Sequence, residues 1–313
     1  MKRVARAIGL PLLLLATSAA AGPGGRDAPE PAMTRYVVVI SIDGLRPDAI
    51  ERYDLGTLGR LAREGSAALD ARTILPSKTL PSHTSMLTGL LPEDHGITFN
   101  RELEGEDNVQ VPTIFEMAHR RGLSTAAFFS KAKFRHLRRP DANDYWQAPG
   151  SNLDNWMATR TVGDAVQYLQ HQRPNLLFVH IGEPDYAGHA MGWMSFFYGL
   201  AARRADAAVG RVLEAADEAY GRGNYTVILT ADHGGHDHDH GSEAEEDVRI
   251  PWIAWGRGVS EGTRPLGVRT MDTAATALWL LGVTVPAHWA GRPVRAAFDG
   301  AGSAMPVAAG AGA

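Results

Sequence analysis

The sequence contains no cysteine among its 313 residues. This absence excludes disulfide bridges, thiolate metal ligands and a lipid-modified cysteine. The chain also has no excess of basic residues, because 31 lysines and arginines face 35 aspartates and glutamates. A mildly acidic chain is poorly suited to the phosphate backbone of a nucleic-acid polymer. We therefore expect any metal to be held by nitrogen and oxygen atoms, and we expect no nucleic-acid polymer as the partner.

Long apolar runs are missing as well. The most apolar stretch, Ala7 to Ala16, follows the basic start Met1-Lys-Arg-Val-Ala-Arg and precedes Ser18-Ala-Ala-Ala21. It is far shorter than the roughly 20 residues that a membrane-spanning helix needs. A basic start, a short apolar core and a small-residue end are typical of a signal peptide. We therefore predict a signal peptide over residues 1–21, cleavage near Ala21, a periplasmic or secreted protein, and no membrane span.

Apolar strands alternate with amphipathic helices along the rest of the chain. Residues 22–33 are rich in proline and glycine and predict a flexible leader, and the Ala/Gly-rich residues 300–313 predict a disordered tail. The pattern predicts strands over residues 36–42, 124–130, 175–181 and 225–230, and helices over residues 55–64, 111–121, 158–171, 195–220 and 270–281. This alternation predicts one catalytic domain over residues 34–299, a three-layer α/β/α fold with a mostly parallel central sheet and a modest insertion around residues 135–155.

Three of the predicted strands end in side chains that bind metals. Asp43 follows the first strand, Asp185 and His189 follow the third, and Asp232 and His233 follow the fourth. Taken singly, Asp43 and Asp185 are also ordinary turn or cap residues, and His189 an ordinary surface imidazole. In an α/β sheet, however, ligands gather outside the carboxyl ends of the strands, and residues four apart share a helix face. The set therefore predicts a site for one or two transition metals.

A candidate nucleophile lies between the first two of these groups. Thr79 stands between Lys78 and Leu80-Pro81, and Pro81 favours the start of a helix whose free N–H groups face an anion. A hydroxyl needs a base or a metal to lose its proton near neutral pH. Thr79 is therefore a nucleophile if the predicted metal site lies beside it.

Four segments together resemble the alkaline phosphatase superfamily, and within it the type I phosphodiesterase and nucleotide pyrophosphatase branch. They are Ser41-Ile-Asp-Gly-Leu-Arg-Pro-Asp48, Pro76-Ser-Lys-Thr-Leu-Pro-Ser-His-Thr-Ser-Met-Leu-Thr-Gly-Leu-Leu-Pro-Glu-Asp-His-Gly-Ile97, Glu183-Pro-Asp-Tyr-Ala-Gly-His189 and Thr230-Ala-Asp-His-Gly-Gly235. The resemblance runs from about Tyr36 to Pro293. A sulfatase that makes formylglycine from cysteine is excluded, because the chain has no cysteine.

The resemblance implies two zinc ions per chain and a threonine nucleophile, although the ligand types also suit manganese or iron. One ion would be held by Asp43, Thr79, Asp232 and His233, and the other by Asp185, His189 and a further histidine. Thr79 would attack phosphorus, and water would then hydrolyse the phosphothreonine. Asn100 matches the family's amide that donates to a non-bridging phosphoryl oxygen, although asparagine is also common in turns.

The last metal ligand falls in the histidine-rich segment His236-Asp-His-Asp-His-Gly241. We choose His240, because a His-Gly pair followed by acidic residues and an apolar run resembles the family's context for this ligand. His236 and His238 are then solvated residues or ligands for adventitious metal. His83 and His95 flank the predicted nucleophile helix, and we interpret them as packing and turn residues.

Less is implied about the substrate. The family's nucleotide-cleaving members carry aromatic residues at the positions of Leu80 and Met191, and a long insertion where only six residues separate His233 from His240. Aromatic residues elsewhere either line an apolar or choline-type pocket or pack in the core: Trp146, Trp156, Trp193, Phe196, Phe197 and Tyr198. We therefore predict hydrolysis of small phosphodiesters or pyrophosphates. The alternatives are a phosphomonoesterase or phosphonate hydrolase of the same superfamily, and a non-catalytic zinc-binding protein that uses the segment from His236 to His240.

Overall fold

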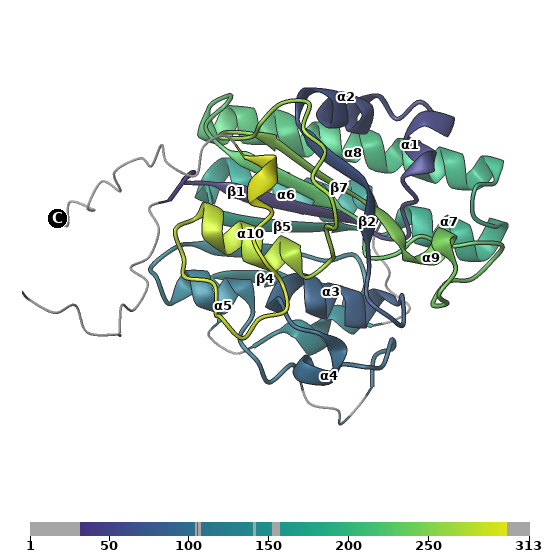
Figure 1. Ribbon diagram of the computed structural model, residues 1–313, viewed down its shortest axis with the longest axis horizontal. Helices are drawn as coiled ribbons and strands as arrows, with labels where there is room; N and C mark the ends of the chain where they lie inside the picture. Colours follow the sequence, from purple (N-terminus) through teal and green to yellow (C-terminus); the bar gives the residue numbers. More distant parts are fainter. Residues whose placement is uncertain (1–31, 104, 106–107, 140–141, 152–156, 299–313) are drawn as a thin grey trace, which may run out of the picture.

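The computed structural model describes residues 32–103, 105, 108–139, 142–151 and 157–298. The predicted signal peptide (residues 1–21), all but the end of the predicted leader (22–33) and the predicted tail (300–313) lie outside these residues, as does Trp156. The described residues build one seven-stranded sheet in the order β2-β7-β6-β1-β5-β3-β4. Helices cover both of its faces (Figure 1).

The centre of the sheet consists of the three strands whose ends carry the predicted ligands. Strands β1 (Val37–Ile42), β5 (Leu176–Ile181) and β6 (Thr226–Thr230) are buried along their whole length. Strand β1 pairs in parallel with both of the others. A strand that is buried on both faces consists of a continuous run of apolar and β-branched residues, which is why these three strands could be predicted from the sequence. The prediction of a mostly parallel sheet is confirmed.

The outer strands depend more on their neighbours than on their own sequence. Strand β3 (Thr125–Phe128) extends the parallel set, and the three-residue strand β4 (Tyr145–Gln147) forms one edge from within the segment that we predicted to be an insertion. At the other side, β7 (Arg249–Gly256) runs antiparallel to both β6 and the edge strand β2 (Ser66–Arg72). The sheet is therefore mixed, with β7 as its reversed strand.

The helices form the two outer layers (Figure 1). Helices α2 (Gly56–Glu64), α6 (Ala158–Gln172) and α8 (Phe196–Tyr220) pack together on one face, with α7 (Glu183–Met191) against α8. Helices α3 (Thr79–Thr88), α5 (Ile114–His119) and α10 (Asp272–Leu280) cover the other face, with α4 (Pro92–His95) against α3. The remaining short elements are α1 (Asp48–Arg52), α9 (Glu245–Val248), and the 3₁₀ helices η1 (Ala132–Leu137) and η2 (Arg295–Ala297). A helix with the length and apolar character to cross a bilayer is not found in the described part of the chain.

Two of the helix starts that differ from the predictions have local reasons. Helix α5 begins at Ile114, three residues later than we predicted, because the Thr113 hydroxyl accepts the Glu116 N–H and caps the helix. Helix α3 begins at Thr79, two residues before Pro81, because Lys78 is still extended. Thr79 is therefore the first helical residue, where backbone N–H groups lack partners within the helix.

Candidate active site

The carboxyl ends of β1, β5 and β6 bring the predicted ligands together. Asp43 directly follows β1, Asp185 lies in the first turn of α7 after β5, and Asp232 follows β6. Gly44 makes this approach possible: its φ is +70°, and a Cβ atom there would lie 3.1 Å from the Cα of Asp185. Its N–H donates to Asp232 Oδ1 at 3.1 Å. Glycine at this position therefore allows the β1 turn to touch α7 and still orient Asp232.

A buried cluster surrounds the imidazole of His233. Its Nε2 atom lies 3.3 Å from Asp43 Oδ1, 3.3 Å from Asp232 Oδ2 and 3.9 Å from Asp185 Oδ1. The Oγ1 atom of Thr79 lies 3.3 Å from the same nitrogen. The predicted nucleophile thus lies beside His233, the imidazole that three of the predicted carboxylate ligands also face.

A second group of ligand atoms shares Asp185. Its Oδ1 atom lies 3.3 Å from His189 Nε2, one helical turn along α7, and 3.7 Å from His240 Nε2. The donor atoms of these three residues all lie within 4.8 Å of one another. The His240 ring stacks on His233 with 3.5 Å between ring centroids, so the two groups adjoin.

The hydrogen bonds of the three imidazoles fit metal binding. Each Nδ1 atom lies within hydrogen-bonding distance of a backbone carbonyl: 2.8 Å from Gly234 for His233, 2.9 Å from His238 for His189, and 2.8 Å from Ser77 for His240. A proton on Nδ1 leaves Nε2 with a free lone pair, and metal-binding histidines are commonly oriented in this way. All three lone pairs then face carboxylate oxygens, which is unfavourable unless a cation lies between them.

The carboxylates point to the same conclusion. Asp43 Oδ1, Asp185 Oδ1 and Asp232 Oδ2 are buried and have no hydrogen-bond partner among the described residues. Burial and the neighbouring Asp43 raise the pKa of Asp232 to about 8. Burial alone would lower the pKa of His233, but Asp232 and Asp43 raise it to about 9. Both shifts describe a site that lacks positive charge, and orphaned carboxylate oxygens beside imidazole nitrogens fit a divalent metal.

Two lysines next to the site were missed by the sequence analysis. The Nζ atom of Lys131 lies 2.6 Å from Asp43 Oδ2 and 2.5 Å from Asp185 Oδ2. It therefore links the two groups of ligands through the carboxylate oxygens that do not face His233. Burial would lower the pKa of Lys131, but the two carboxylates hold it above its ordinary value. Lys133 donates to Asn100 Oδ1 at 3.3 Å, and burial lowers its pKa to about 8. Neither lysine of Ser130-Lys-Ala-Lys133 belongs to a motif or spacing that could have revealed its role from the sequence.

A third residue that was missed is His180, which lies on β5. Its Nε2 atom donates to Asp43 Oδ2 at 2.9 Å, and its Nδ1 atom lies 2.7 Å from the Ser130 hydroxyl. Asp43 is therefore held by His180 and Lys131 through one oxygen, which leaves the other oxygen directed at His233. Burial favours the neutral acid, yet Lys131 and these imidazoles keep the pKa of Asp43 well below its ordinary value.

Asn100 lies at the amino end of α3. Its Oδ1 atom accepts the Leu80 N–H at 2.8 Å, so the amide oxygen is tied to the residue that follows Thr79. This bond leaves the N–H groups of the side-chain amide as donors. His83 supports the same turn, because its Nδ1 donates to the Thr79 carbonyl at 2.8 Å. His83 and His95 are both buried, in agreement with packing and turn roles.

The two other histidines of the segment differ in their surroundings. The His238 side chain is exposed, in agreement with the expectation of a solvated residue, whereas His236 is half-buried with its Nδ1 atom 2.7 Å from Asp247 Oδ1. Three of the aromatic residues pack in or against the core. Trp193 and Tyr198 are buried and both donate to the Gly44 carbonyl, and Trp146 packs on Phe129.

Two aromatic residues do not pack in the core. Phe196 is 70% exposed and Phe197 is 51% exposed, at the start of α8. Of the two positions that carry stacking aromatics in nucleotide-cleaving relatives, Leu80 is fully buried and Met191 is 47% exposed. Leu80 is therefore not placed to contact a base in this conformation.

The seven-stranded sheet with helices on both faces is an alkaline phosphatase-like α/β fold. Murine ectonucleotide pyrophosphatase / phosphodiesterase 5, solved as an inactive threonine-to-alanine variant in complex with AMP, shares the fold with a TM-score of 0.69 at 16% identity, over 80% of this chain and 96% of that chain. A 2-O GAG sulfatase has the same TM-score of 0.69 at 16% identity, over 83% of this chain and 73% of that chain.

Residues 37–258 match the type I phosphodiesterase / nucleotide pyrophosphatase family, and the chain belongs to that family. Human ectonucleotide pyrophosphatase/phosphodiesterase family member 1 is 25% identical over 234 residues, which cover 68% of this chain and 24% of that protein. Venom phosphodiesterase 2 of Crotalus adamanteus is 25% identical over 239 residues, which cover 68% of this chain and 28% of that protein. The chain thus spans about a quarter of the length of these curated relatives.

Proposed function

We propose that this protein is a two-zinc phosphodiesterase or pyrophosphatase that hydrolyses small phosphodiesters through a phosphothreonine on Thr79. The observation that carries the proposal is the position of Thr79 Oγ1, 3.3 Å from an imidazole nitrogen that faces three carboxylates. Thr79 is also the first residue of α3, where free N–H groups favour an anion such as a phosphoryl group. A purely structural metal site has no need of a hydroxyl at this position.

The ligand roles follow the two groups of atoms. Asp43, Thr79, Asp232 and His233 would hold one zinc ion, and Asp185, His189 and His240 the other. Zinc bound there would lower the pKa of a coordinated hydroxyl or water and stabilise charge on the phosphoryl oxygens. The same residues fit manganese or iron, which favour similar ligands.

The chain's own groups account for the remaining steps. Thr79 Oγ1 forms a bond to phosphorus as the bond to the leaving alcohol or phosphate breaks. The hydroxyl proton is released to solvent, and the leaving oxygen takes up a proton from water. The side-chain amide of Asn100 donates to a non-bridging oxygen of the phosphoryl group. A water molecule then cleaves the phosphothreonine bond, which returns the Thr79 hydroxyl and releases the phosphate product.

The position of Lys133 favours the alternative activities, a phosphomonoesterase or a phosphonate hydrolase. A phosphomonoester carries one more negative charge than a diester, and a phosphonate can carry an additional anionic group. Lys133 is half-buried, donates to Asn100 and has no carboxylate partner among the ion pairs of the described residues. Its ammonium group could therefore compensate an extra substrate charge, so a phosphomonoesterase or phosphonate hydrolase is the second candidate.

Turnover of three chromogenic substrates separates these candidates. We expect the purified protein to hydrolyse bis-nitrophenyl phosphate or nitrophenyl thymidine monophosphate faster than nitrophenyl phosphate. Dominant hydrolysis of nitrophenyl phosphate would contradict the diesterase proposal and support a monoesterase. A chain that binds zinc without hydrolysing any of them would support a non-catalytic zinc-binding protein.

The nucleophile is tested by Thr79→Ala. Removal of an enzyme's nucleophile typically lowers kcat by about 10³-fold or more. We expect a loss of that size. We also expect rapid acid quenching of the wild type during diester turnover to trap the substrate's phosphoryl group, with its remaining ester, on Thr79, detected by mass spectrometry. Full activity of Thr79→Ala would refute the mechanism even though the fold is right.

We also propose that the protein is exported. The sequence of residues 1–21 supports this, as do the names of the venom and ectonucleotide relatives. Amino-terminal sequencing of the protein recovered outside the cytoplasm should begin near Gly22. A mature protein that retained Met1 would contradict the proposal.

A further inference from the structure

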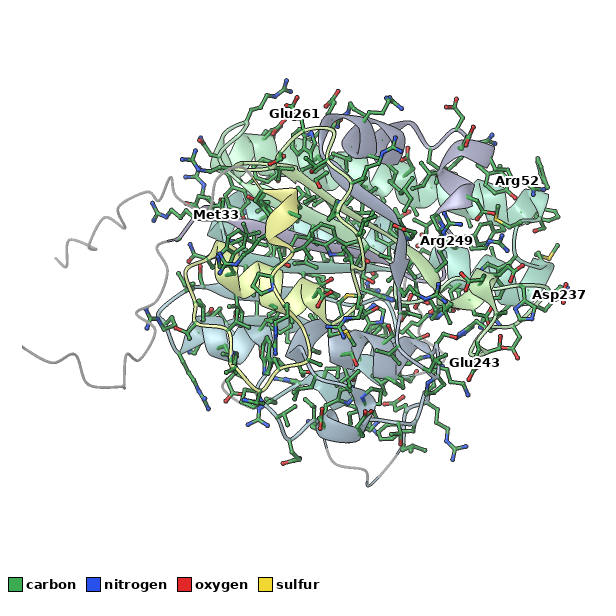
Figure 2. The ribbon with its side chains drawn as sticks, in the orientation of Figure 1. Met33, Arg52, Asp237, Glu243, Arg249 and Glu261 are labelled. Carbon is green, nitrogen blue, oxygen red and sulfur yellow. The ribbon has the colours of Figure 1, made fainter. Side chains whose placement is uncertain are left out.

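The loop from Gly234 to Ser242 supplies or orients both histidines of the second ligand group. His240 belongs to the loop, and His189 donates to the carbonyl of His238 within it at 2.9 Å. The backbone N–H of Trp193 donates to the Asp237 carbonyl at 2.7 Å, which connects the middle of the loop to the segment that follows α7. Figure 2 shows Asp237 at the periphery of the molecule, and residues 237–239 are exposed, so the outer part of this loop faces solvent.

Asp247 closes the loop from inside. This residue is fully buried in the short helix α9, and its carboxylate contacts both ends of the loop. Near the start, His236 Nδ1 lies 2.7 Å from Asp247 Oδ1. At the end, the Ser242 N–H and hydroxyl donate to Asp247 Oδ2 at 2.9 and 2.7 Å. The Asp247 carbonyl also accepts the Gly234 N–H at 2.8 Å.

A chain of hydrogen bonds leads from Asp247 to the ligand. The Ser242 carbonyl accepts from the Ser77 hydroxyl at 2.8 Å. The Ser77 carbonyl in turn accepts from His240 Nδ1 at 2.8 Å, and this bond leaves His240 Nε2 directed at Asp185. Ser77 is two residues before Thr79, so the same contacts join the loop to the turn that carries the proposed nucleophile.

We propose that Asp247 is a positioning residue for the second zinc ion. Its carboxylate fixes both ends of the loop, and the loop holds His240 and His189 in the tautomer and orientation that leave Nε2 free for the metal. The first zinc site depends less on this loop, because Asp43 and Asp232 follow β1 and β6 and Thr79 begins α3. Its fourth ligand, His233, contacts the loop through the Gly234 carbonyl and not through the Asp247 carboxylate. The inference rests on the proposed two-zinc function and assigns the control of one of its two metals to a residue outside the ligand set.

The experiment is a zinc titration of chelator-treated, dialysed protein by isothermal titration calorimetry, with wild type, Asp247→Asn and Glu245→Gln compared. Glu245 is a matched control, because it is an acid in the same helix whose exposed carboxylate pairs with Arg72 instead of the loop. Loss of a residue that orients a ligand typically weakens metal binding about 10–100-fold. We expect a weakening of that size for one zinc in Asp247→Asn, the other zinc unchanged within about twofold, and Glu245→Gln like the wild type.

Two further readouts separate positioning from general destabilisation. Turnover of bis-nitrophenyl phosphate by Asp247→Asn should recover as zinc is raised, so that the zinc concentration for half activity changes more than kcat. Ser242→Ala removes the hydroxyl bond to Asp247 together with the acceptor of the Ala244 N–H, and it serves if Asp247→Asn does not fold. The two substitutions together should weaken the second zinc no more than the stronger one alone, because they interrupt one chain of contacts.

The outcomes distinguish this inference from the function on which it rests. Two zinc ions bound as tightly by Asp247→Asn and Ser242→Ala as by Glu245→Gln would overturn the role of Asp247 and leave the two-zinc function intact. Equal weakening of both zinc ions would also overturn it, since a specific role in the second site would then be absent. A wild-type protein that binds no zinc would overturn the two-zinc function and this inference together.

Discussion

Replacing Lys131 with methionine should strongly destabilise the metal-free protein, because two buried carboxylates would lose the cation they share. Lys131 Nζ lies 2.6 Å from Asp43 Oδ2 and 2.5 Å from Asp185 Oδ2, and all three side chains are almost inaccessible to solvent. Removal of one partner from a buried ion pair costs about 3–5 kcal/mol, since it leaves an uncompensated charge. His180 still donates to Asp43, so we expect a loss within that range.

Denaturant unfolding in the presence of a chelator measures this loss directly. With excess zinc, the difference between Lys131→Met and wild type should shrink, because the metals then compensate the same carboxylates. Lys133→Met is the matched control. Burial lowers the pKa of Lys133 to about 8, so its charge is costly in the folded state, and its replacement should leave the protein equally stable or more stable at pH 7. A loss below about 1 kcal/mol for Lys131→Met in chelator would refute the reasoning, because buried pairs cost more than that to break.

Three further predictions concern single residues. Gly44→Ala should weaken zinc binding and lower the free energy of unfolding more than Gly122→Ala does. Both glycines have positive φ, so each substitution costs about 1 kcal/mol of backbone strain, but only at Gly44 does the new Cβ lie 3.1 Å from Asp185. Equal effects of the two substitutions in zinc titration and unfolding would contradict this. Asn100→Asp should keep the hydrogen bond to the Leu80 N–H but remove the amide N–H that donates to the phosphoryl oxygen. We therefore expect kcat in a bis-nitrophenyl phosphate assay to fall by about 10²-fold or more. An unchanged kcat would show that Asn100 has no role in the mechanism. Burial lowers the pKa of His95 to about 4. Below pH 6.5 the unfolded chain therefore binds a proton at His95 that the folded chain does not bind, and the free energy of unfolding decreases as the pH is lowered. Between pH 7.5 and pH 5 the wild type should lose about 2 kcal/mol more than His95→Gln in urea unfolding, and parallel pH profiles would contradict this.

The elements that were predictable are those whose sequence carries a strong local signal. Strands β1, β5 and β6 are uninterrupted buried runs, and α8 begins where the Ser195 hydroxyl accepts the Tyr198 N–H. Strand β2 was missed, because its sequence Ser-Ala-Ala-Leu-Asp-Ala-Arg has little preference for a strand and is held by pairing with β7. Tertiary context decides such an edge strand, and a single sequence does not show it.

The same division applies to the site. Asp43, Asp232 and His233 could be found because each follows a buried strand, and Asp185 and His189 because their spacing is that of one helical turn. Lys131, His180 and Asp247 come from three separate segments, and their importance lies in contacts across 54, 137 and 11 residues of sequence respectively. Periodicity and spacing describe only neighbours in the chain, so these supporting residues became visible only in the folded structure.

The most direct test of the two-metal threonine mechanism is elemental analysis of the purified mature protein, with bis-nitrophenyl phosphate turnover measured on the same sample before and after chelation. We predict about two zinc ions per chain, as a paired-metal hydrolase requires, loss of turnover on chelation, and recovery when zinc is added back. A protein that contains no metal and keeps its turnover in chelator would contradict the account.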